Sequence, residues 1–501
     1  MKDKQAMQPS LGTMKSLKIN YLFNLLLTVS NIIFPIITYP YAARVMGANA
    51  LGLVNFANSF LTYFIILSSL GVPVYGLREI AKIRNNKFEL SKLYSELMSI
   101  SAILSVASSV LYFIIVYLFS TFTKNQFLHG ILGISIILNL FSIDWFFTGL
   151  EEFKFIAIRG IIIRLLSLIL LITLVKKSED YIIYAALGLL ASALANIFNF
   201  IISMKYVKYQ FNNLNLLKHV KPIVLYSILA ITINMYFNLG ITLLGFLSKN
   251  EQVANFTVAF RLILLSLTFI SSATYTVMPR VSYYLNNDMG DAFIEVFSKV
   301  LKFFGMIAFP LALAIFLLSE QFIYIFVGKE FITAGRCFQV LAPVVIISGL
   351  SNLVGNNFLL PSRGERQVLY SALAGLTINI IANTIFIPIY GSIGAAISYL
   401  LAELTILCYQ IVILQKHHSS IFKLIFYEIR YTHYIASSVI VGLFIIVLKI
   451  VMHSQFLIMI LSLVICPVIY LIMLMYFEDA ILNDLLIKFK NIAFGESNAS
   501  N

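Results

Sequence analysis

The feature that most constrains this chain is the repeated absence of charge over lengths that match the thickness of a lipid bilayer. Stretches without Asp, Glu, Lys or Arg cover residues 19–43, 45–77, 97–123, 125–143, 181–204, 222–248, 337–362, 367–402 and 450–477. About 20 apolar residues in an α-helix cross a bilayer core, so each stretch is long enough, or nearly so, for one transmembrane helix. Only 11% of the 501 residues are charged and 60% are hydrophobic, which excludes a water-soluble enzyme of this size.

We therefore predict an all-α integral membrane protein with about fourteen transmembrane helices. Some spans need a charged residue inside them or at an end, and Pro388, Gly391 and Gly394 divide the stretch 367–402 into two helices. The expected spans are 19–44, 51–76, 95–120, 127–149, 155–175, 181–204, 222–247, 251–275, 299–318, 334–360, 367–388, 393–415, 431–450 and 455–477.

Basic residues give this bundle an orientation. If the N-terminus is cytoplasmic, the inward loops carry 25 Lys and Arg residues and the outward loops carry 8. Such an excess in short loops marks the cytoplasmic side, so we expect both termini to be cytoplasmic. The net charge of +13 is then explained by loop residues, and no nucleic-acid partner is expected.

The chain also contains the traces of an internal duplication. The pattern Asn-Phe-x-x-x-Phe occurs at 55–60 and again at 255–260, and Ala-Ala followed by an aliphatic residue occurs at 185–187 and at 395–397. Two parallel six-helix lobes around a shared cavity are a transporter design. The expected parts are a cytoplasmic segment 1–18, an N-terminal lobe 19–205, a linker 206–221, a C-terminal lobe 222–415, a loop 416–430, two extra helices within 431–477 and a tail 478–501.

Motifs for catalysis and for metal binding are missing from the sequence. It contains no HExxH, GxSxG or P-loop pattern, and its three cysteines show no CxxC spacing. We therefore expect a protein that is not an enzyme and that needs no cofactor and no metal.

Polar residues inside the predicted helices are the candidates for a binding site, because a charge at membrane depth is costly and is usually retained for function. Arg261 and Arg164 would bind an anionic headgroup, and Arg44, which follows Pro40 in the first helix, would present a cation beyond a helix break. Glu403 would bind the H⁺ or Na⁺ of a coupled transport cycle. Ion pairing, snorkelling and interfacial anchoring remain open as structural alternatives.

Asparagines form a second group of candidates. Asn55, Asn58 and Asn255 lie within predicted helices, at spacings that place several asparagines of each lobe on a shared helix face. Such a polar face either lines a wet cavity or supplies hydrogen bonds between helices, and the sequence leaves both readings open.

An ordered set of short motifs resembles the polysaccharide-transport flippases of the multidrug, oligosaccharidyl-lipid and polysaccharide exporter superfamily. The motifs are Tyr39-Pro40-Tyr41-Ala42-Ala43-Arg44-Val45-Met46-Gly47, Leu51-Gly52, Leu70-Gly71-Val72, Tyr75-Gly76-Leu77-Arg78-Glu79-Ile80-Ala81, Asp144-Trp145-Phe146-Phe147-Thr148-Gly149-Leu150-Glu151, Phe326-Val327-Gly328-Lys329-Glu330-Phe331, Leu360-Pro361-Ser362-Arg363-Gly364-Glu365 and Gly391-Ser392-Ile393-Gly394-Ala395-Ala396. They extend from about residue 15 to residue 478.

The resemblance implies a flippase that moves undecaprenyl-pyrophosphate-linked oligosaccharide repeat units across the bacterial cytoplasmic (inner) membrane by alternating access, for O-antigen, capsule or exopolysaccharide synthesis. Its partners would be the lipid-linked oligosaccharide, membrane lipids and the glycosyltransferases and polymerase of the same pathway. Arg44 lies in a family motif, and Arg78, Glu79, Asp144 and Glu151 are the motif residues expected to form a cytoplasmic gate.

Three other functions remain possible from the sequence. A lipid-linked peptidoglycan precursor flippase would use the same mechanism. A multidrug or cation antiporter of the same superfamily would be expected to have twelve helices and an acidic cavity, whereas Arg164 and Arg261 are basic. A polymerase or ligase would need larger external loops than this chain provides.

Overall fold

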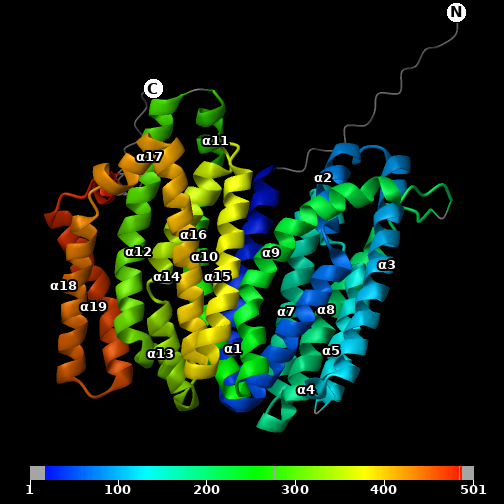
Figure 1. Ribbon diagram of the computed structural model, residues 1–501, viewed down its shortest axis with the longest axis horizontal. Coiled ribbons are helices and arrows are strands. Elements are labelled where there is room, and N and C mark those ends of the chain that lie inside the picture. The colour runs from blue at the N-terminus through cyan, green and yellow to red at the C-terminus, as the bar shows by residue number, and fades with distance from the viewer. Residues whose placement is uncertain are drawn as a thin grey trace, which may run out of the picture. The chain divides into compact units, whose positions relative to one another are not determined.

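The computed structural model describes residues 17–123, 125–210, 212–275, 277–287, 289–484 and 486–487. Within them the chain is built from helices and short connections, with no β-strand (Figure 1). Residues 1–16 of the expected N-terminal segment 1–18 and most of the expected tail 478–501 lie outside the described residues. An all-helical membrane architecture is therefore confirmed.

The chain divides into two compact units, and the divisions fall inside helices. The first unit contains the chain up to Val45 together with Leu61–Ile231, and the second contains Met46–Phe60 together with the chain from Thr232 onward. The expected lobes 19–205 and 222–415 describe a sequence repeat rather than compactness, so their boundaries stay a prediction.

Some helices of the first unit lie close to the expected spans, such as 155–175 and 181–204, whereas the helix expected at 95–120 begins at Lys87. The first unit contains the two ends of α1 (Leu17–Ser69), up to residue 45 and from residue 61, and the first part of α9 (Leu217–Leu247), up to residue 231. Between them lie α2 (Val72–Ile83), α3 (Lys87–Leu118), α4 (Ser120–Thr123), α5 (Gln126–Leu138), α6 (Asp144–Gly149), α7 (Phe153–Leu174) and α8 (Tyr181–Ser203), with 3₁₀ turns at Asn139–Phe141 and Ser178–Asp180.

The second unit contains the middle of α1, the rest of α9 and all later helices. These are α10 (Asn250–Tyr275), α11 (Met278–Asn286), α12 (Gly290–Phe326), α13 (Ile332–Leu341), α14 (Val344–Asn352), α15 (Glu365–Tyr390), α16 (Ser392–His417), α17 (Ser419–Lys423), α18 (Thr432–Val451) and α19 (Gln455–Tyr476), with a 3₁₀ turn at Lys329–Phe331 and π-helical segments at Leu353–Leu359 and Leu424–Glu428.

The α1 helix runs through the position where a loop was expected. Its 53 residues contain a single non-helical position, Gly47, at φ 73° and ψ 175°. At about 1.5 Å per residue an unbroken helix of this length would be far longer than a bilayer is thick, so the break at Gly47 separates two segments of spanning length. Only glycine adopts this backbone conformation without strain, which explains why one residue is enough to end one segment and begin the next.

Among the described residues, eleven helices are long and apolar enough to cross a membrane, or twelve if the bent pair Lys329–Leu341 and Val344–Leu359 is one span. The expected count of fourteen thus stays a prediction. Two differences arise in the structure: α1 and α2 count together as one long helix, and the predicted span 334–360 is bent by 49° between Lys329–Leu341 and Val344–Leu359.

The α12 helix is longer than its predicted span 299–318. It contains 37 residues and begins at Gly290, because a helix can continue into water once its apolar part has left the bilayer. Its first turns carry Asp291, Glu295 and Lys299, and Lys299 pairs with Glu295 at 2.6 Å. The predicted outer loop after residue 318 is correspondingly shorter, since α12 continues to Phe326.

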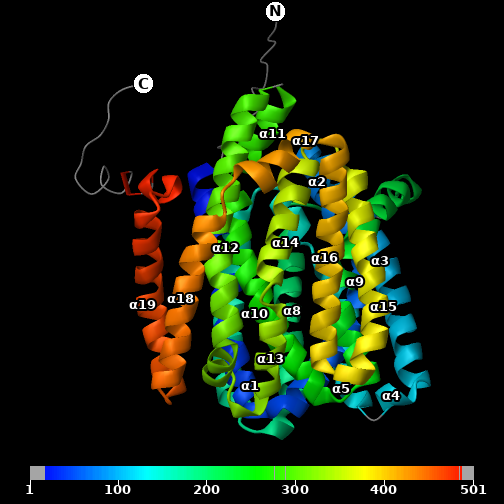
Figure 2. The same cartoon turned by 60° about the vertical axis from the view of Figure 1, so that its left-hand side comes forward.

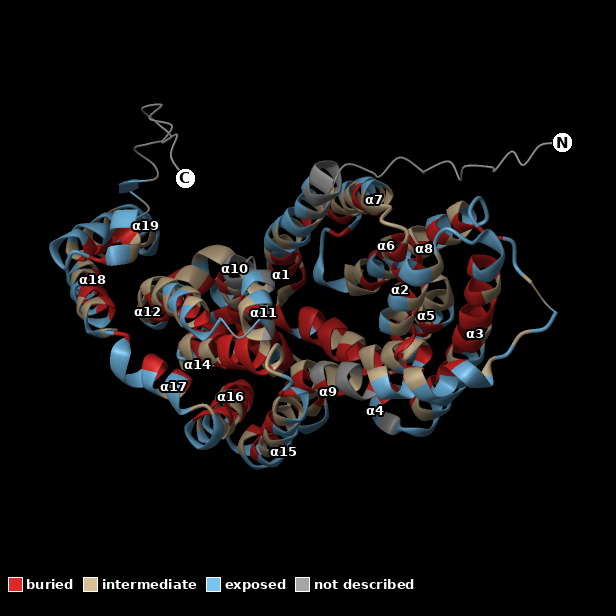
Figure 3. Ribbon diagram, turned by 90° about the horizontal axis from the view of Figure 1, so that it is seen from above, coloured by how far each residue is buried: buried red, intermediate tan, exposed pale blue. Residues whose placement is uncertain are grey.

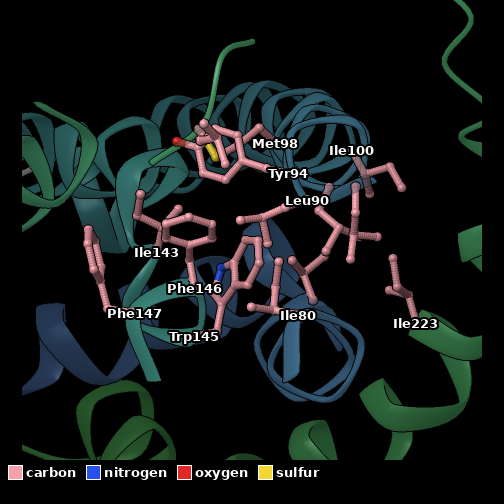
Figure 4. Packing of buried hydrophobic residues seen from close by; sticks show 14 of the residues in the cluster. Ile80, Leu90, Tyr94, Met98, Ile100, Ile143, Trp145, Phe146, Phe147 and Ile223 are labelled. Atoms are coloured by element: carbon pink, nitrogen blue, oxygen red, sulfur yellow. The ribbon is translucent and has the colours of Figure 1, made fainter. Parts of the chain in front are cut away.

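Aromatic residues fill the core of the first unit at one end of its helices (Figure 4). Trp145, Phe146 and Phe147 of α6 pack against Ile80 of α2 and Tyr94 of α3. Gly76 admits Trp145 to this core, because a Cβ at residue 76 would lie 2.5 Å from the indole. Trp145 is therefore a buried residue of this core, with 7% of its surface exposed.

The two C-terminal helices belong to the second unit, where they pack on α12 (Figure 2). Their contact is apolar around Val441, Ile445 and Leu474, and the Tyr470 hydroxyl donates a 2.8 Å hydrogen bond to the Met306 carbonyl. Large aliphatic side chains of these helices, such as Leu443 and Leu463, are exposed. Figure 3 shows long exposed stretches along α18 and α19. Exposed apolar faces of this extent are expected where lipid is the solvent.

Candidate functional site

The polar residues selected from the sequence are divided between the two units. The first unit holds Arg44, Arg78, Glu79, Asp144, Glu151 and Arg164, and the second holds Asn55, Asn58, Asn255, Arg261 and Glu403.

Arg164 is held by side chains of α1. Its guanidinium, on the middle of α7, donates to Ser30 Oγ and to Asn31 Oδ1. Gly160, one helical turn earlier, allows this close approach, because a Cβ there would lie 3.3 Å from Leu27 of α1. Neither partner is a carboxylate, so Arg164 keeps its full positive charge in a polar setting and could still attract an anion.

Three of the four motif residues at the end of the first unit have charged partners. Glu151 accepts a 2.6 Å hydrogen bond from Arg84, and Glu79 accepts one of 2.6 Å from Lys82. Both pairs are partly or largely exposed, so each contributes little stability by itself. The Arg84–Glu151 pair holds the connection after α2 against the connection after α6, whereas the Glu79–Lys82 pair lies within α2.

Asp144 is the third, and it forms part of a three-residue network. Its Oδ1 accepts from Arg159 at 2.9 Å and from Asn199 Nδ2 at 2.8 Å, and Arg159 also donates to Asn199. The network joins α6, α7 and α8. Sequence analysis admitted Arg159 into the predicted span 155–175 without a role, whereas the structure pairs it with a carboxylate 15 residues away in sequence.

Arg78 binds an aromatic partner instead. Its guanidinium donates a 2.7 Å hydrogen bond to the Tyr226 hydroxyl and lies 5.1 Å from the centre of that ring. Tyr226 in turn stacks on Tyr75 at 6.4 Å. Arg78 is exposed, so the contact fixes the side chain at the surface of the unit and leaves part of the guanidinium accessible.

Sequence analysis missed a buried carboxylate in the first unit. Glu96 is fully buried on α3, where it accepts hydrogen bonds from the Asn215 backbone N–H at 2.9 Å and from His219 Nε2 at 2.8 Å. Lys218 Nζ lies 2.9 Å from the same carboxylate, and His219 Nδ1 is bonded to the Tyr75 hydroxyl at 2.8 Å. This cluster fastens the predicted linker 206–221 to α3.

Glu403 occupies a comparable position in the second unit. It is 4% exposed on α16 and accepts a 2.8 Å hydrogen bond from the Tyr236 hydroxyl of α9. The ring of Tyr236 lies 5.2 Å from that of Tyr399, one turn before Glu403. Sequence analysis considered an ion pair with Arg261 for this carboxyl group, but the structure records a tyrosine partner, which favours the hydrogen-bonded alternative.

The asparagines of the repeated pattern are both buried in the second unit. Asn55 and Asn255 are each 4% exposed, whereas Asn58 is only half-buried. Asn255 Oδ1 has no hydrogen-bond partner among the described residues. An amide oxygen left unpaired in a core is costly, so this atom is suited to accept a hydrogen bond from water or from a ligand.

Arg44 and Arg261 are exposed. Arg261 is an exposed charge on α10. Among the candidate membrane-spanning helices of the described residues, α10 is the most buried, because 61% of the residues in its most apolar stretch are buried. A guanidinium on a helix with so little outward surface can bind a phosphate through two parallel hydrogen bonds. In the described residues, no three His, Cys, Asp or Glu side chains are grouped so that they could hold a metal ion.

A family model described as polysaccharide biosynthesis protein matches residues 17–285, more than half of the chain. A "Putative O-antigen transporter" of Escherichia coli (strain K12) is 22% identical over 397 residues, which cover 77% of this chain and 94% of the relative. A protein of the same name from Shigella dysenteriae is 24% identical and covers 79% of this chain and 99% of the relative. A "Probable low-salt glycan biosynthesis flippase Agl15" of Haloferax volcanii is 22% identical over 34% of this chain.

Two solved structures share the fold. The lipid II flippase MurJ in an inward closed conformation matches 92% of this chain and all of its own chain, with a TM-score of 0.75 and 16% identity. An inward-facing multidrug resistance transporter of the MATE family and MOP superfamily matches 80% of this chain and 99% of its own, with a TM-score of 0.61 and 15% identity. At these identities the likeness concerns the fold.

Proposed function

The chain belongs to the polysaccharide biosynthesis protein family, and from this premise we propose that it is a flippase for undecaprenyl-pyrophosphate-linked oligosaccharide repeat units. The observation that carries the proposal is the match of the family model to residues 17–285 together with O-antigen transporters aligned over most of the chain. The protein is a multi-pass membrane protein and its relatives are transporters rather than enzymes. It would translocate the repeat unit by alternating access for O-antigen, capsule or exopolysaccharide synthesis.

Electrostatics supports a headgroup role for the arginines. A pyrophosphate and several sugars cannot pass through hydrocarbon unless water and counter-charges replace their lost hydration. Arg164 carries no carboxylate partner in the described residues, and Arg261 is exposed. We propose that Arg44, Arg164 and Arg261 bind the pyrophosphate, while the buried Asn55 and Asn255 and the half-buried Asn58 bind sugar hydroxyls, with the prenyl chain remaining in lipid.

Glu403 is the proposed site of ion coupling. A carboxyl group buried on α16 with a tyrosine hydroxyl at 2.8 Å can exist in neutral and charged forms, and taking up H⁺ or Na⁺ would remove the cost of burying its charge. We propose that Arg78, Glu79, Asp144 and Glu151 form the cytoplasmic gate, in which the exposed pairs with Lys82 and Arg84 can break at little cost.

The proposed location is the bacterial cytoplasmic (inner) membrane with both termini in the cytoplasm, which is the orientation that the excess of basic residues in alternate loops supports. The proposed partners beyond the lipid-linked substrate and membrane lipids are the glycosyltransferases and polymerase of the same pathway, because the repeat unit must be built on one side and consumed on the other.

Transport can be tested with purified protein in liposomes that contain a fluorescent lipid-linked oligosaccharide. The flippase should expose the oligosaccharide to an enzyme or quencher on the opposite side faster than protein-free liposomes do. The same liposomes loaded with lipid II test the peptidoglycan precursor alternative, and a fluorescent cation tests the multidrug alternative. Transport of either of these, without transport of the oligosaccharide, would refute the proposal.

The role of Arg261 can be tested in cells that depend on this protein for surface polymer. Arg261→Ala should abolish the polymer at an unchanged protein level, whereas Arg261→Lys should keep part of it because the positive charge remains. Arg336→Ala, which removes an exposed arginine from α13 of the same unit, serves as the matched control and should be neutral. Normal polymer in the Arg261→Ala strain would exclude a headgroup role.

A further inference from the structure

A cavity of about 610 Å³ opens at one end of the second unit, away from every residue assigned above. Its walls come from the end of α11 and the start of α12, from the turn that precedes α15, and from the corner between α16 and α17; α11 and α17 lie at the same end in both side views (Figures 1 and 2). Binding sites for small molecules and lipid headgroups have volumes of this size, about 300–1,000 Å³.

The lining combines an aromatic floor with a positively charged rim. Phe293 and Phe358 pack with ring centres 5.7 Å apart, and Phe358 meets the edge of His418 at 4.9 Å. Ser362 and Arg363 form the polar side, and no carboxylate is among the lining residues. Burial, reinforced by the neighbouring His417, lowers the pKa of His418, so the guanidinium of Arg363 is the permanent charge of the cavity.

Arg363 also has an unusual backbone. It occupies the left-handed region at φ 63°, at the end of a helix. The Arg363 N–H donates to the Leu360 carbonyl at 3.2 Å, and the Gly364 N–H donates to the Leu359 carbonyl at 2.7 Å. Glycine is the usual residue at this position of the Schellman motif. A charged residue in a backbone conformation where glycine would be less strained is a candidate for a functional side chain.

The first unit contains the matching turn with the opposite charge. Glu151 has φ 59° and makes the same two backbone bonds, from Glu151 N–H to Thr148 O and from Glu152 N–H to Phe147 O. Residue 151 precedes residue 363 by nearly the same offset that relates 185–187 to 395–397. Glu151 is paired with Arg84 at 2.6 Å, whereas the Arg363 side chain has no ion pair or hydrogen bond to any described residue.

The position of the cavity relative to the predicted membrane spans indicates which kind of anion it would bind. The cavity is level with Gly290–Ile294 of α12, and its inner edge at Ile294 lies about 7.5 Å along the helix before Lys299. Asp291 and Glu295 lie on the same turns of α12 but do not line the cavity. The predicted membrane span begins at residue 299, and headgroups occupy about 5–8 Å beyond the hydrocarbon. The inner edge of the cavity therefore lies at the level of lipid phosphates, and so does Arg363, which lies between the predicted spans that end at residue 360 and begin at residue 367. Phe358, on the aromatic floor, lies within the predicted span 334–360 and is therefore the lining residue nearest to the acyl region.

We propose that the Arg363 cavity binds the phosphate of an anionic membrane phospholipid, with the glycerol and first methylenes of the lipid against Phe293 and Phe358. In the first unit, Arg84 is paired with the carboxylate of Glu151. The lipid phosphate would be the corresponding anionic partner of Arg363 in the second unit. This site is a resident lipid site that stabilises the corner between α16 and α17, and its occupation is independent of which cargo the protein transports.

The test uses the full-length protein purified in a neutral detergent, with the midpoint of thermal unfolding as the readout. Phosphatidylglycerol, phosphatidylcholine and inorganic phosphate are each titrated into the wild type, Arg363→Asn and Arg366→Gln. Asparagine tolerates the left-handed backbone and lacks the charge. Arg366 is an exposed arginine in the first turn of α15 that does not line the cavity, so its loss is the matched control.

Phosphatidylglycerol should raise the midpoint of the wild type more than phosphatidylcholine does, and inorganic phosphate should have little effect. Arg363→Asn should weaken the apparent affinity for phosphatidylglycerol about tenfold, which is the size expected for one charged hydrogen bond, and Arg366→Gln should leave it unchanged. Arg363→Lys should recover part of the response. The proposal is overturned if both lipids raise the midpoint equally or if inorganic phosphate alone gives the full shift. It is also overturned if Arg363→Asn and Arg366→Gln respond alike to phosphatidylglycerol.

Discussion

Gly52 is the position at which packing in the second unit depends most directly on the absence of a side chain. It lies in the segment Met46–Phe60 of α1, and a Cβ at residue 52 would be 1.8 Å from the Asn250 carbonyl O and 2.5 Å from its carbonyl C. Both are backbone atoms at the start of α10, so no rotamer change can relieve the overlap. A contact of 3.0 Å, the shortest that real Cβ atoms show, requires the two helices to separate by 1.2 Å.

The expected magnitude follows from what this separation breaks. Overpacking a well-packed contact costs about 1–3 kcal/mol, and the hydrogen bond from Asn250 to Asn49 at 3.1 Å contributes about 1 kcal/mol more. The ring of Phe56, which fits against Gly245, would also lose contact. We therefore expect Gly52→Ala to lower the free energy of unfolding by about 3 kcal/mol.

The assay is thermal unfolding of the purified protein in detergent, and Gly188→Ala is the matched control. Gly188 lies within α8, where nothing stands within 4 Å of the added Cβ, so its replacement should leave the midpoint nearly unchanged. Gly52→Ala should lower the midpoint strongly and should reduce surface polymer through loss of folded protein. Equal midpoints for the two variants would refute the reasoning about close helix approach.

Three further predictions concern the buried polar groups. Glu96→Ala should destabilise the protein by about 3–5 kcal/mol because it leaves Lys218 and His219 without their carboxylate, whereas Glu96→Gln should cost less; equal losses in thermal unfolding would contradict this. Burial lowers the pKa of His219, so the unfolded chain takes up a proton at a higher pH than the folded protein does. Stability should therefore fall as the pH drops below about 6.5. His219→Gln should flatten this dependence in unfolding midpoints measured between pH 7.5 and 5. Glu403→Gln should remove the effect of an ion gradient on transport in liposomes while Tyr236→Phe only weakens it, and a gradient response that survives Glu403→Gln would exclude coupling through this carboxyl group.

The spans could be predicted because hydropathy depends only on local composition. The α7 helix, Phe153–Leu174, agrees with the expected span 155–175 within a few residues, and α19 agrees equally well. The length of α12 could not be predicted in this way, because the apolar criterion stops at Lys299 while the helical hydrogen bonds continue in water to Gly290. Apolarity identifies only the part of a helix that must cross the bilayer, and the helix itself can be longer than that part.

The partners of the polar residues were beyond the reach of sequence reasoning. Asp144 was recognised as a motif residue, but its partner Asn199 lies 55 positions away. Glu96 served only as the end of a charge-free stretch, since nothing local indicates that His219, 123 positions later, will meet it. Spacing along one helix predicts which residues share a face, and it carries no information about which face the next helix presents.

The division of the chain inside α1 and α9 has a mechanical consequence. The chain passes from one unit to the other after Val45, after Phe60 and after Ile231. The first crossing lies two residues before the break at Gly47, whereas the other two lie within continuous helix. At these two crossings any rocking must bend a helical rod, in α1 and in α9, and the stiffness of that helix resists the movement. Pro35 and Pro40, which precede the first crossing in α1, make that part of α1 softer by removing hydrogen bonds where curvature is needed.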